Sequence, residues 1–214
     1  MNPKDLWKNY KSLLFETFPD LAHDSTWAEW ESKGTSLKAD IFKNDWFIKS
    51  RAVDIWSKRS NIYNNIICPK TSAKVPTGRL PCFGMDLMGF TDKKVIIVFD
   101  FQHPTENFLF GVEGLPKQTG NIRFFEPGNH FSENIYVVKC TFDEVDEHLD
   151  MFKKYLTAYK TMVECSMPTE EDTTVYNDFD KYMTKLDPVG GYLTGIFGKE
   201  KAESLVNDFL FCYG

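Results

Sequence analysis

The sequence predicts an α/β protein in which an antiparallel sheet is covered by helices on its faces. Segments with strand character fill the middle of the chain, and helical patterns occupy its C-terminal third. Strands gathered in one block, with helices mostly after them, indicate an antiparallel sheet with packed helices. At 214 residues, the chain is expected to form one domain over residues 1–214 with a substantial core.

The N-terminal half contributes one helix and then strands. Residues 3–19 predict a helix, because apolar residues recur at helical spacing before Pro19 closes the segment. Alternating apolar residues predict strands over residues 37–41, 46–55 and 62–67. Residues 93–101 are apolar enough for a strand that is covered on both faces.

The C-terminal third predicts three helices. One apolar face runs through residues 145–163, and two further helices are expected over residues 172–186 and 198–211. Glycine and proline mark turns near residues 76–81, 111–120 and 127–128.

Asp86 is the most informative single residue, because it stands in the otherwise apolar or small stretch of residues 80–88. A carboxylate on the buried face of a sheet is costly unless it is paired or protonated. Asp86 is therefore either a proton donor whose pKa is raised by burial, or a residue that is exposed to solvent at a strand end or satisfied by local backbone donors. Asp187 repeats the situation before Pro188, where its other reading is a turn residue that ends a helix.

Several longer strings carry a resemblance to a known family. They are CFGMDLM at residues 82–88, KKVIIVFDFQHP at 93–104, RFFE at 123–126, GNHFS at 128–132, EDTTVY at 171–176, LDP at 186–188 and VNDFLF at 206–211. With these strings the chain resembles the ferredoxin-dependent bilin reductases, and among them the phycoerythrobilin synthase type of marine cyanophages. The resemblance implies a three-layer α/β/α sandwich with a central antiparallel sheet flanked by helices.

The resemblance also implies an activity and its residues. The substrate would be biliverdin IXα, reduced by single electrons from ferredoxin through 15,16-dihydrobiliverdin to phycoerythrobilin. Asp86 and Asp187 match the two carboxylates that flank the pigment and protonate it. Asn64 stands where the phycocyanobilin-forming branch has histidine, so it would orient the pigment without supplying a proton.

Three further residues are expected to contact the substrate. Arg123 is the candidate for holding a propionate, since an arginine grips a carboxylate at two points, although a surface salt bridge is an equal alternative. Met85 and Ser132, which lie in the strings quoted above, are expected to line the pigment site.

Composition agrees with an aromatic pocket and gives no sign of a resident cofactor. Aromatic residues make up 15% of the chain, which suits either a site for a flat conjugated ligand or simply an aromatic core. The five cysteines and four histidines show no metal-ligand spacing, and no glycine-rich nucleotide motif is present. A reductase of this kind is expected to bind no redox cofactor of its own and to take electrons from reduced ferredoxin.

Charge suggests where that partner docks. The net charge is −6, yet residues 49–79 hold seven basic residues against the single acid Asp54. Ferredoxins are acidic, so this segment is the expected docking face, unless it is an ordinary solvated surface. The basic residues are Lys49, Arg51, Lys58, Arg59, Lys70, Lys74 and Arg79.

Other classes of partner are not expected. The acidic balance argues against nucleic acid. With no run of 18 apolar residues and an N-terminus interrupted by charges, neither a membrane span nor a signal peptide is expected. The protein is expected to be a cytoplasmic monomer, in the host cell if it is phage-encoded. Two other functions stay open: a single two-electron bilin reductase, and a bilin carrier without catalysis.

Overall fold

The computed structural model describes residues 6–70, 74–75, 78–91, 94–104, 110–120, 127–166, 174–186 and 189–212. Its centre is a seven-stranded antiparallel sheet in the order β1-β2-β3-β4-β7-β8-β9, beside a two-stranded ribbon of β5 and β6. The strands are β1 (Ala22–Ser32), β2 (Thr35–Lys43), β3 (Phe47–Ser57), β4 (Ser60–Pro69), β5 (Lys74–Val75), β6 (Gly78–Arg79), β7 (Cys82–Phe90), β8 (Val95–Gln102) and β9 (Tyr136–Cys140).

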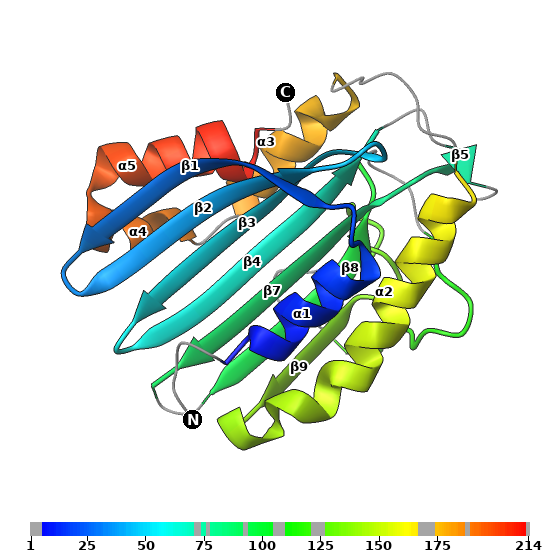
Figure 1. Cartoon of the computed structure of the whole chain (residues 1–214), viewed down its shortest axis with the longest axis horizontal. Helices are drawn as coiled ribbons and strands as arrows, with labels where there is room; N and C mark the ends of the chain where they lie inside the picture. The colour runs from blue at the N-terminus through cyan, green and yellow to red at the C-terminus, as the bar shows by residue number, and fades with distance from the viewer. Residues whose placement is uncertain are drawn as a thin grey trace.

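Helices cover both faces of the sheet (Figure 1), so the expected three-layer α/β/α sandwich is confirmed. One face carries α1 (Lys8–Thr17) and α2 (Leu149–Glu164), and the other carries the helices that follow α2 in the chain. These later helices are η3 (Thr174–Tyr176), α3 (Asn177–Leu186), α4 (Val189–Phe197), α5 (Lys199–Ser204) and η4 (Leu205–Leu210).

Local sequence explains the tight connections at the edge of the sheet. Lys33 and Gly34 join β1 to β2 with φ angles of 50° and 73°, the left-handed geometry that suits a two-residue hairpin turn. Between β2 and β3, the Asn44 side-chain oxygen accepts hydrogen bonds from the backbone N–H groups of Trp46 and Phe47 at 3.0 and 2.8 Å.

The core beneath α1 and α2 absorbs much of the aromatic content. Phe83, Phe99 and Phe101 of the sheet pack against Tyr155 and Tyr159 of α2, and all five side chains are fully buried. The Tyr159 hydroxyl donates to the Pro81 carbonyl at 2.9 Å, so even the polar end of that ring is satisfied. On this face the abundance of aromatic residues therefore reflects core packing.

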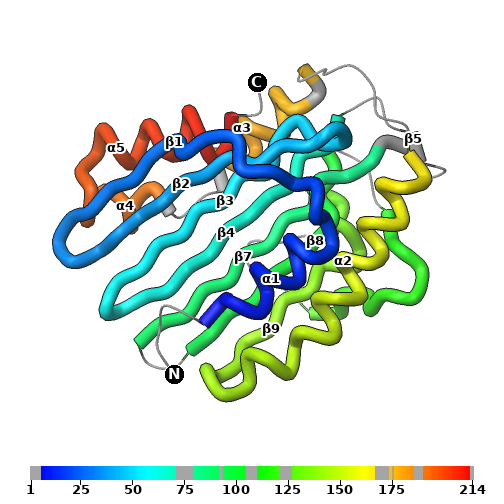
Figure 2. The backbone as a smooth tube through the Cα atoms, viewed as in Figure 1, coloured from blue at the N-terminus to red at the C-terminus, as the bar shows by residue number. Residues whose placement is uncertain are grey.

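The opposite face is covered by two separate groups of helices (Figure 2). Helices α4, α5 and η4 pack on β1 to β3, where Leu193 and Phe209 are buried against Val53. Helix α3 packs further along the sheet, with Phe179 against Cys82 and Ile66. Several residues of β4, β7, β8 and β9 remain half-buried.

The helices differ from expectation at three points. The segment before α2 is a 3₁₀ helix, η2 (Phe142–His148), and the last expected helix continues beyond α5 as the π-helix η4. Helix α4 was not expected at all, because Gly190, Gly191 and Gly195 disfavour helix. Leu193 is fully buried in the core from within α4, so tertiary packing overrides the weak local preference.

Candidate active site

The site lies across the central parts of three neighbouring strands, β4, β7 and β8. Asn64 of β4 lies opposite Asp86 of β7, and Asp86 lies opposite Val98 of β8. Residues directly opposite each other on neighbouring strands point to the same side of a sheet, so these three residues share one face. It is the face that carries α3, α4, α5 and η4. The Asn64 amide donates a hydrogen bond to the Asp86 carboxyl group.

Asp86 has the electrostatic character expected of an acid. It is half-buried, and desolvation raises its pKa above the ordinary value for aspartate. The hydrogen bond from Asn64 acts in the opposite direction, because an amide donor favours the ionised carboxylate. Burial is the larger of the two effects, so the neutral acid persists to higher pH than in an exposed aspartate.

The surroundings of this pair are apolar. Met88 is the next residue of β7 on the same face, and Ile96 and Val137 flank Val98 on β8 and β9. All three are half-buried. Ile96 and Val137, like Tyr182 and Met183 of α3, pack against the buried cluster that contains Val98. A flat apolar ligand laid on this face would contact aliphatic side chains, with the carboxyl group and the amide as its polar anchors.

Met85 does not join this site. It is 2% exposed and belongs to the core beneath α1 and α2, on the other face of the sheet from Asp86. The alternation of side chains in β7 separates the two neighbours. The expectation that Met85 lines the pigment site is therefore corrected.

Ser132 is engaged in a buried structural network. Its hydroxyl and its backbone N–H both donate to the carboxyl group of Asp100 on β8, the latter at 3.1 Å. The Asn134 backbone N–H in turn donates to the Ser132 hydroxyl at 3.0 Å. Ser132 is 0% exposed. Its hydroxyl therefore helps to hold residues 127–135 against β8 and does not face a ligand.

Asp100 is the residue that the sequence reading missed. It is 1% exposed, and burial raises its pKa well above the ordinary value, although the hydrogen bonds from Ser132 favour the ionised form. Asp100 lies opposite Gly84, two residues along β7 from Asp86 and on the same face of the sheet. The signal that identified Asp86, a carboxylate within an apolar strand, was equally present here.

The remaining expected site residues cannot be placed. Asp187 lies outside the described residues, between the end of α3 at Leu186 and the start of α4 at Val189. Arg123 also lies outside them.

The expected basic docking face over residues 49–79 is not continuous. Arg51 is 2% exposed and donates from its guanidinium to the Phe209 carbonyl at 2.6 Å. Lys49 is half-buried and donates to the Cys212 carbonyl. Both cations therefore hold the C-terminal segment against β3, while Lys58 and Arg59 in the turn between β3 and β4 are exposed. This expectation is corrected for Lys49 and Arg51.

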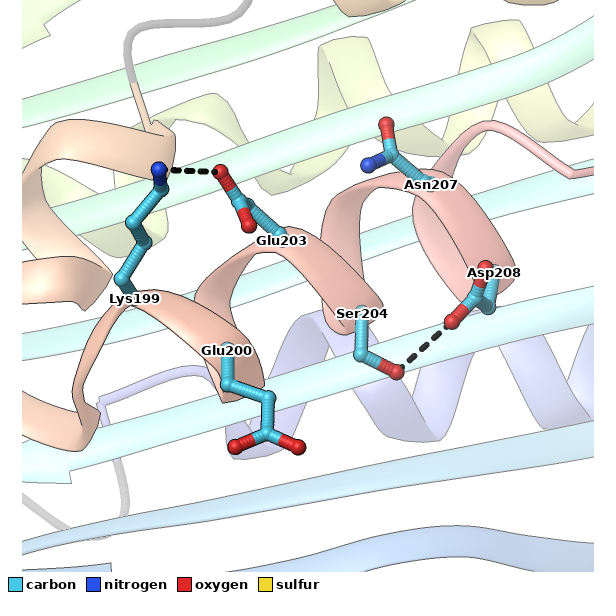
Figure 3. Close-up of a pocket in the computed structure, with 6 residues that line it drawn as sticks. All are labelled: Lys199, Glu200, Glu203, Ser204, Asn207 and Asp208. Carbon is cyan, nitrogen blue, oxygen red and sulfur yellow. Dashed lines mark hydrogen bonds and ion pairs between the residues drawn. The ribbon is translucent and has the colours of Figure 1, made fainter.

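A polar hollow of about 610 Å³ lies elsewhere, on the outer side of α5 and η4 (Figure 3). It is bordered by an ion pair between Lys199 and Glu203 at 3.5 Å and a hydrogen bond from Ser204 to Asp208 at 2.7 Å. Asn64 and Asp86 are not among its lining residues. An exposed, mainly acidic helix surface of this kind gives no indication of a ligand.

Within the described ranges, no group of three or more histidine, cysteine, aspartate or glutamate residues could hold a metal ion. Among the helices of the described residues, none is long and apolar enough to cross a membrane.

Two curated proteins resemble this chain in sequence. The chain is 27% identical over 152 residues to a 15,16-dihydrobiliverdin:ferredoxin oxidoreductase of Prochlorococcus marinus (strain NATL1A), a match that covers 62% of this chain and 64% of that protein. It is 28% identical over 186 residues to a phycoerythrobilin:ferredoxin oxidoreductase of Prochlorococcus marinus (strain MIT 9312), covering 76% of this chain and 71% of that protein.

A solved structure shares the fold. Phytochromobilin synthase from tomato, in complex with biliverdin, superposes with a TM-score of 0.66 at 19% identity, covering 95% of this chain and 82% of that chain. The sequence model of the family described as ferredoxin-dependent bilin reductase matches residues 22–212. Because that match extends over most of the chain, the protein belongs to the ferredoxin-dependent bilin reductase family.

Proposed function

We propose that this protein reduces biliverdin IXα with electrons from reduced ferredoxin, and that its product is phycoerythrobilin, formed through 15,16-dihydrobiliverdin. The observation that carries the proposal is the Asn64–Asp86 pair on a half-buried face of the family fold. The raised pKa of Asp86 suits a group that must still hold a proton near neutral pH.

In the proposed mechanism, biliverdin lies against the face of the sheet that carries Asn64 and Asp86. Asp86 protonates the pigment at a pyrrole nitrogen or lactam oxygen, which makes it easier to reduce. One electron from ferredoxin then gives a neutral radical, and a second electron with a second proton completes the reduction of the 15,16 double bond. Asn64 positions the Asp86 carboxyl group by a hydrogen bond and orients the pigment. It is not itself a proton donor, because an amide is not an acid near pH 7.

A second round would add two electrons and two protons at the A-ring. Asp187 is the proposed donor for this round, on the resemblance of residues 186–188 to the family motif. The overall conversion then consumes four electrons, which four reduced ferredoxin molecules supply one at a time. The protein needs no resident redox centre for this sequence of steps.

A single two-electron reduction to 15,16-dihydrobiliverdin is the second candidate. It is favoured by the name of several relatives, each a 15,16-dihydrobiliverdin:ferredoxin oxidoreductase. A carrier without catalysis is disfavoured, because a binding protein has no need of a desolvated carboxyl group at Asp86.

Anaerobic turnover tests the proposal. Biliverdin and the protein would be supplied with reduced ferredoxin, and the products identified by absorption and chromatography. Phycoerythrobilin as the final product would support the four-electron route, whereas accumulation of 15,16-dihydrobiliverdin would establish the two-electron alternative.

A further inference from the structure

A second hollow lies at one end of the sheet, where β7 ends, β8 begins and β9 is followed by η2. Figure 1 shows β7, β8 and β9 side by side in the sheet. Its volume is about 910 Å³, and the turn between β3 and β4 borders it on one side. Its lining includes Arg59, Phe90, Lys94, Ile96, Lys139 and Glu144. We call this hollow the basic groove.

The basic groove is positively charged in an acidic protein. Arg59, Lys94 and Lys139 are all exposed, and Glu144 is the one acid among the described residues that line the groove. The Glu144 carboxylate accepts hydrogen bonds from the backbone N–H and the hydroxyl of Thr141 at 2.8 and 2.9 Å, so it is committed to capping η2. The groove therefore presents a local positive surface, while the whole chain has a net charge of −6.

The basic groove borders the candidate active site. Ile96 and Lys139 lie opposite each other on β8 and β9, and Ile96 shares the face of Val98, the cross-strand partner of Asp86. Ile96 and Val98 are two positions apart in β8, a distance of about 7 Å along a strand. A partner seated in the groove would therefore lie next to the edge of the surface on which the pigment is proposed to bind.

We infer that the basic groove is the docking site of reduced ferredoxin, an inference that rests on the proposed function. The half-buried side chains of Phe90 and Ile96 supply an apolar centre, and the three cations supply a rim that matches an acidic partner. Small interfaces with charged rims suit electron carriers, which must dissociate after each transfer. In each encounter one ferredoxin is oxidised by one electron and the bound bilin is reduced by one electron.

The alternative is that these cations hold the propionates of the pigment. The two assignments differ in what the groove recognises, a protein surface or a small carboxylate ligand. Ferredoxin is favoured because the cations are spread over one end of the sheet, with Arg59 between β3 and β4, Lys94 between β7 and β8, and Lys139 within β9. Ile96, the cross-strand partner of Lys139, lies two positions along β8 from Val98 in the row of Asn64, Asp86 and Val98.

Charge reversal tests the inference. The double variant Lys94→Glu with Lys139→Glu would be compared with wild type and with Lys153→Glu, an exposed change of the same sign on α2, which covers the other face of the sheet. Three quantities are measured: the ferredoxin concentration for half-maximal rate at low and high salt, the rate with a photoreduced 5-deazaflavin as a small donor, and the biliverdin Kd by absorption titration.

We expect the double variant to need about 10-fold or more ferredoxin at low salt, an effect that shrinks at high salt. Its deazaflavin-driven rate and its biliverdin Kd should stay within about twofold of wild type, as should every quantity in Lys153→Glu. An unchanged ferredoxin requirement would overturn the inference, and a weakened biliverdin Kd would assign the cations to the propionates. If wild type reduces biliverdin with neither donor, the proposed function itself fails.

Discussion

Replacing Asp86 by Asn should separate pigment binding from pigment reduction. The asparagine side chain has nearly the same shape as aspartate, and its carbonyl oxygen can still accept the hydrogen bond from Asn64. The local geometry of β7 is therefore retained. What is lost is the proton that the carboxyl group carries because burial raises its pKa.

Loss of a positioned general acid lowers a rate by roughly 10²- to 10⁴-fold. At about 1.4 kcal/mol for each factor of ten, this corresponds to about 3–5 kcal/mol in the barrier. The biliverdin Kd should change by less than about threefold, because the apolar contacts of the site remain and the asparagine amide still offers a polar anchor where the carboxyl group stood.

The pH dependence gives an independent check. Only the protonated form of Asp86 can donate, so the wild-type rate should fall as pH rises through its raised pKa. Asp86→Asn should show a low rate without this limb. The raised pKa also means that wild type loses stability relative to Asp86→Asn as pH rises above about 4, the usual pKa of an unfolded aspartate.

The assay is anaerobic single turnover of protein-bound biliverdin with photoreduced ferredoxin, followed by absorption. Asp150→Asn is the matched control, since Asp150 is exposed in the first turn of α2, which covers the other face of the sheet. A rate for Asp86→Asn within about threefold of wild type, with the same pH profile, would refute the assignment of Asp86 as the proton donor.

Three further substitutions test other parts of the site. Asn64→Leu removes a donor that lowers the Asp86 pKa, so the alkaline limb of the pH–rate profile should move to higher pH, and an unmoved limb would mean that the two side chains are not coupled in solution. Ser132→Ala leaves the buried Asp100 carboxyl group without one donor and should lower the free energy of unfolding by about 1–3 kcal/mol, measured by urea denaturation, with little change in biliverdin affinity. Weaker biliverdin binding at unchanged stability would instead return Ser132 to the substrate site. Asp187→Asn should accumulate 15,16-dihydrobiliverdin on chromatography, and clean conversion to phycoerythrobilin would place the second donor elsewhere.

Much of the fold could be predicted because its signals are local. Alternation over residues 37–41 and 62–67 identified β2 and β4, and the apolar run over residues 93–101 identified β8, in which Ile96 alone is half-buried. The sequence does not predict helix α4, because its glycines resemble a turn. Its helical state depends on the burial of Leu193 against strands that are distant in the chain. Packing between residues far apart in the chain leaves no local pattern.

The site shows the same division. Asp86 was found because a carboxylate in an apolar strand is unusual, and Asp100 carried the same signal without being selected. The sequence itself separates Met85 from the site, because side chains of neighbouring residues in a strand point to opposite faces and Asp86 faces the site. The contacts of Arg51 and Ser132 were not accessible, since their partners lie 158 and 32 residues away.

Anaerobic multiple turnover with reduced ferredoxin tests the central claim most directly. With no other electron donor present, biliverdin should be consumed only when protein and reduced ferredoxin are both present, with a transient 15,16-dihydrobiliverdin band that gives way to phycoerythrobilin. A bound biliverdin spectrum that stays unchanged, beside an active reductase run with the same ferredoxin, would contradict the claim that this chain is a bilin-reducing enzyme.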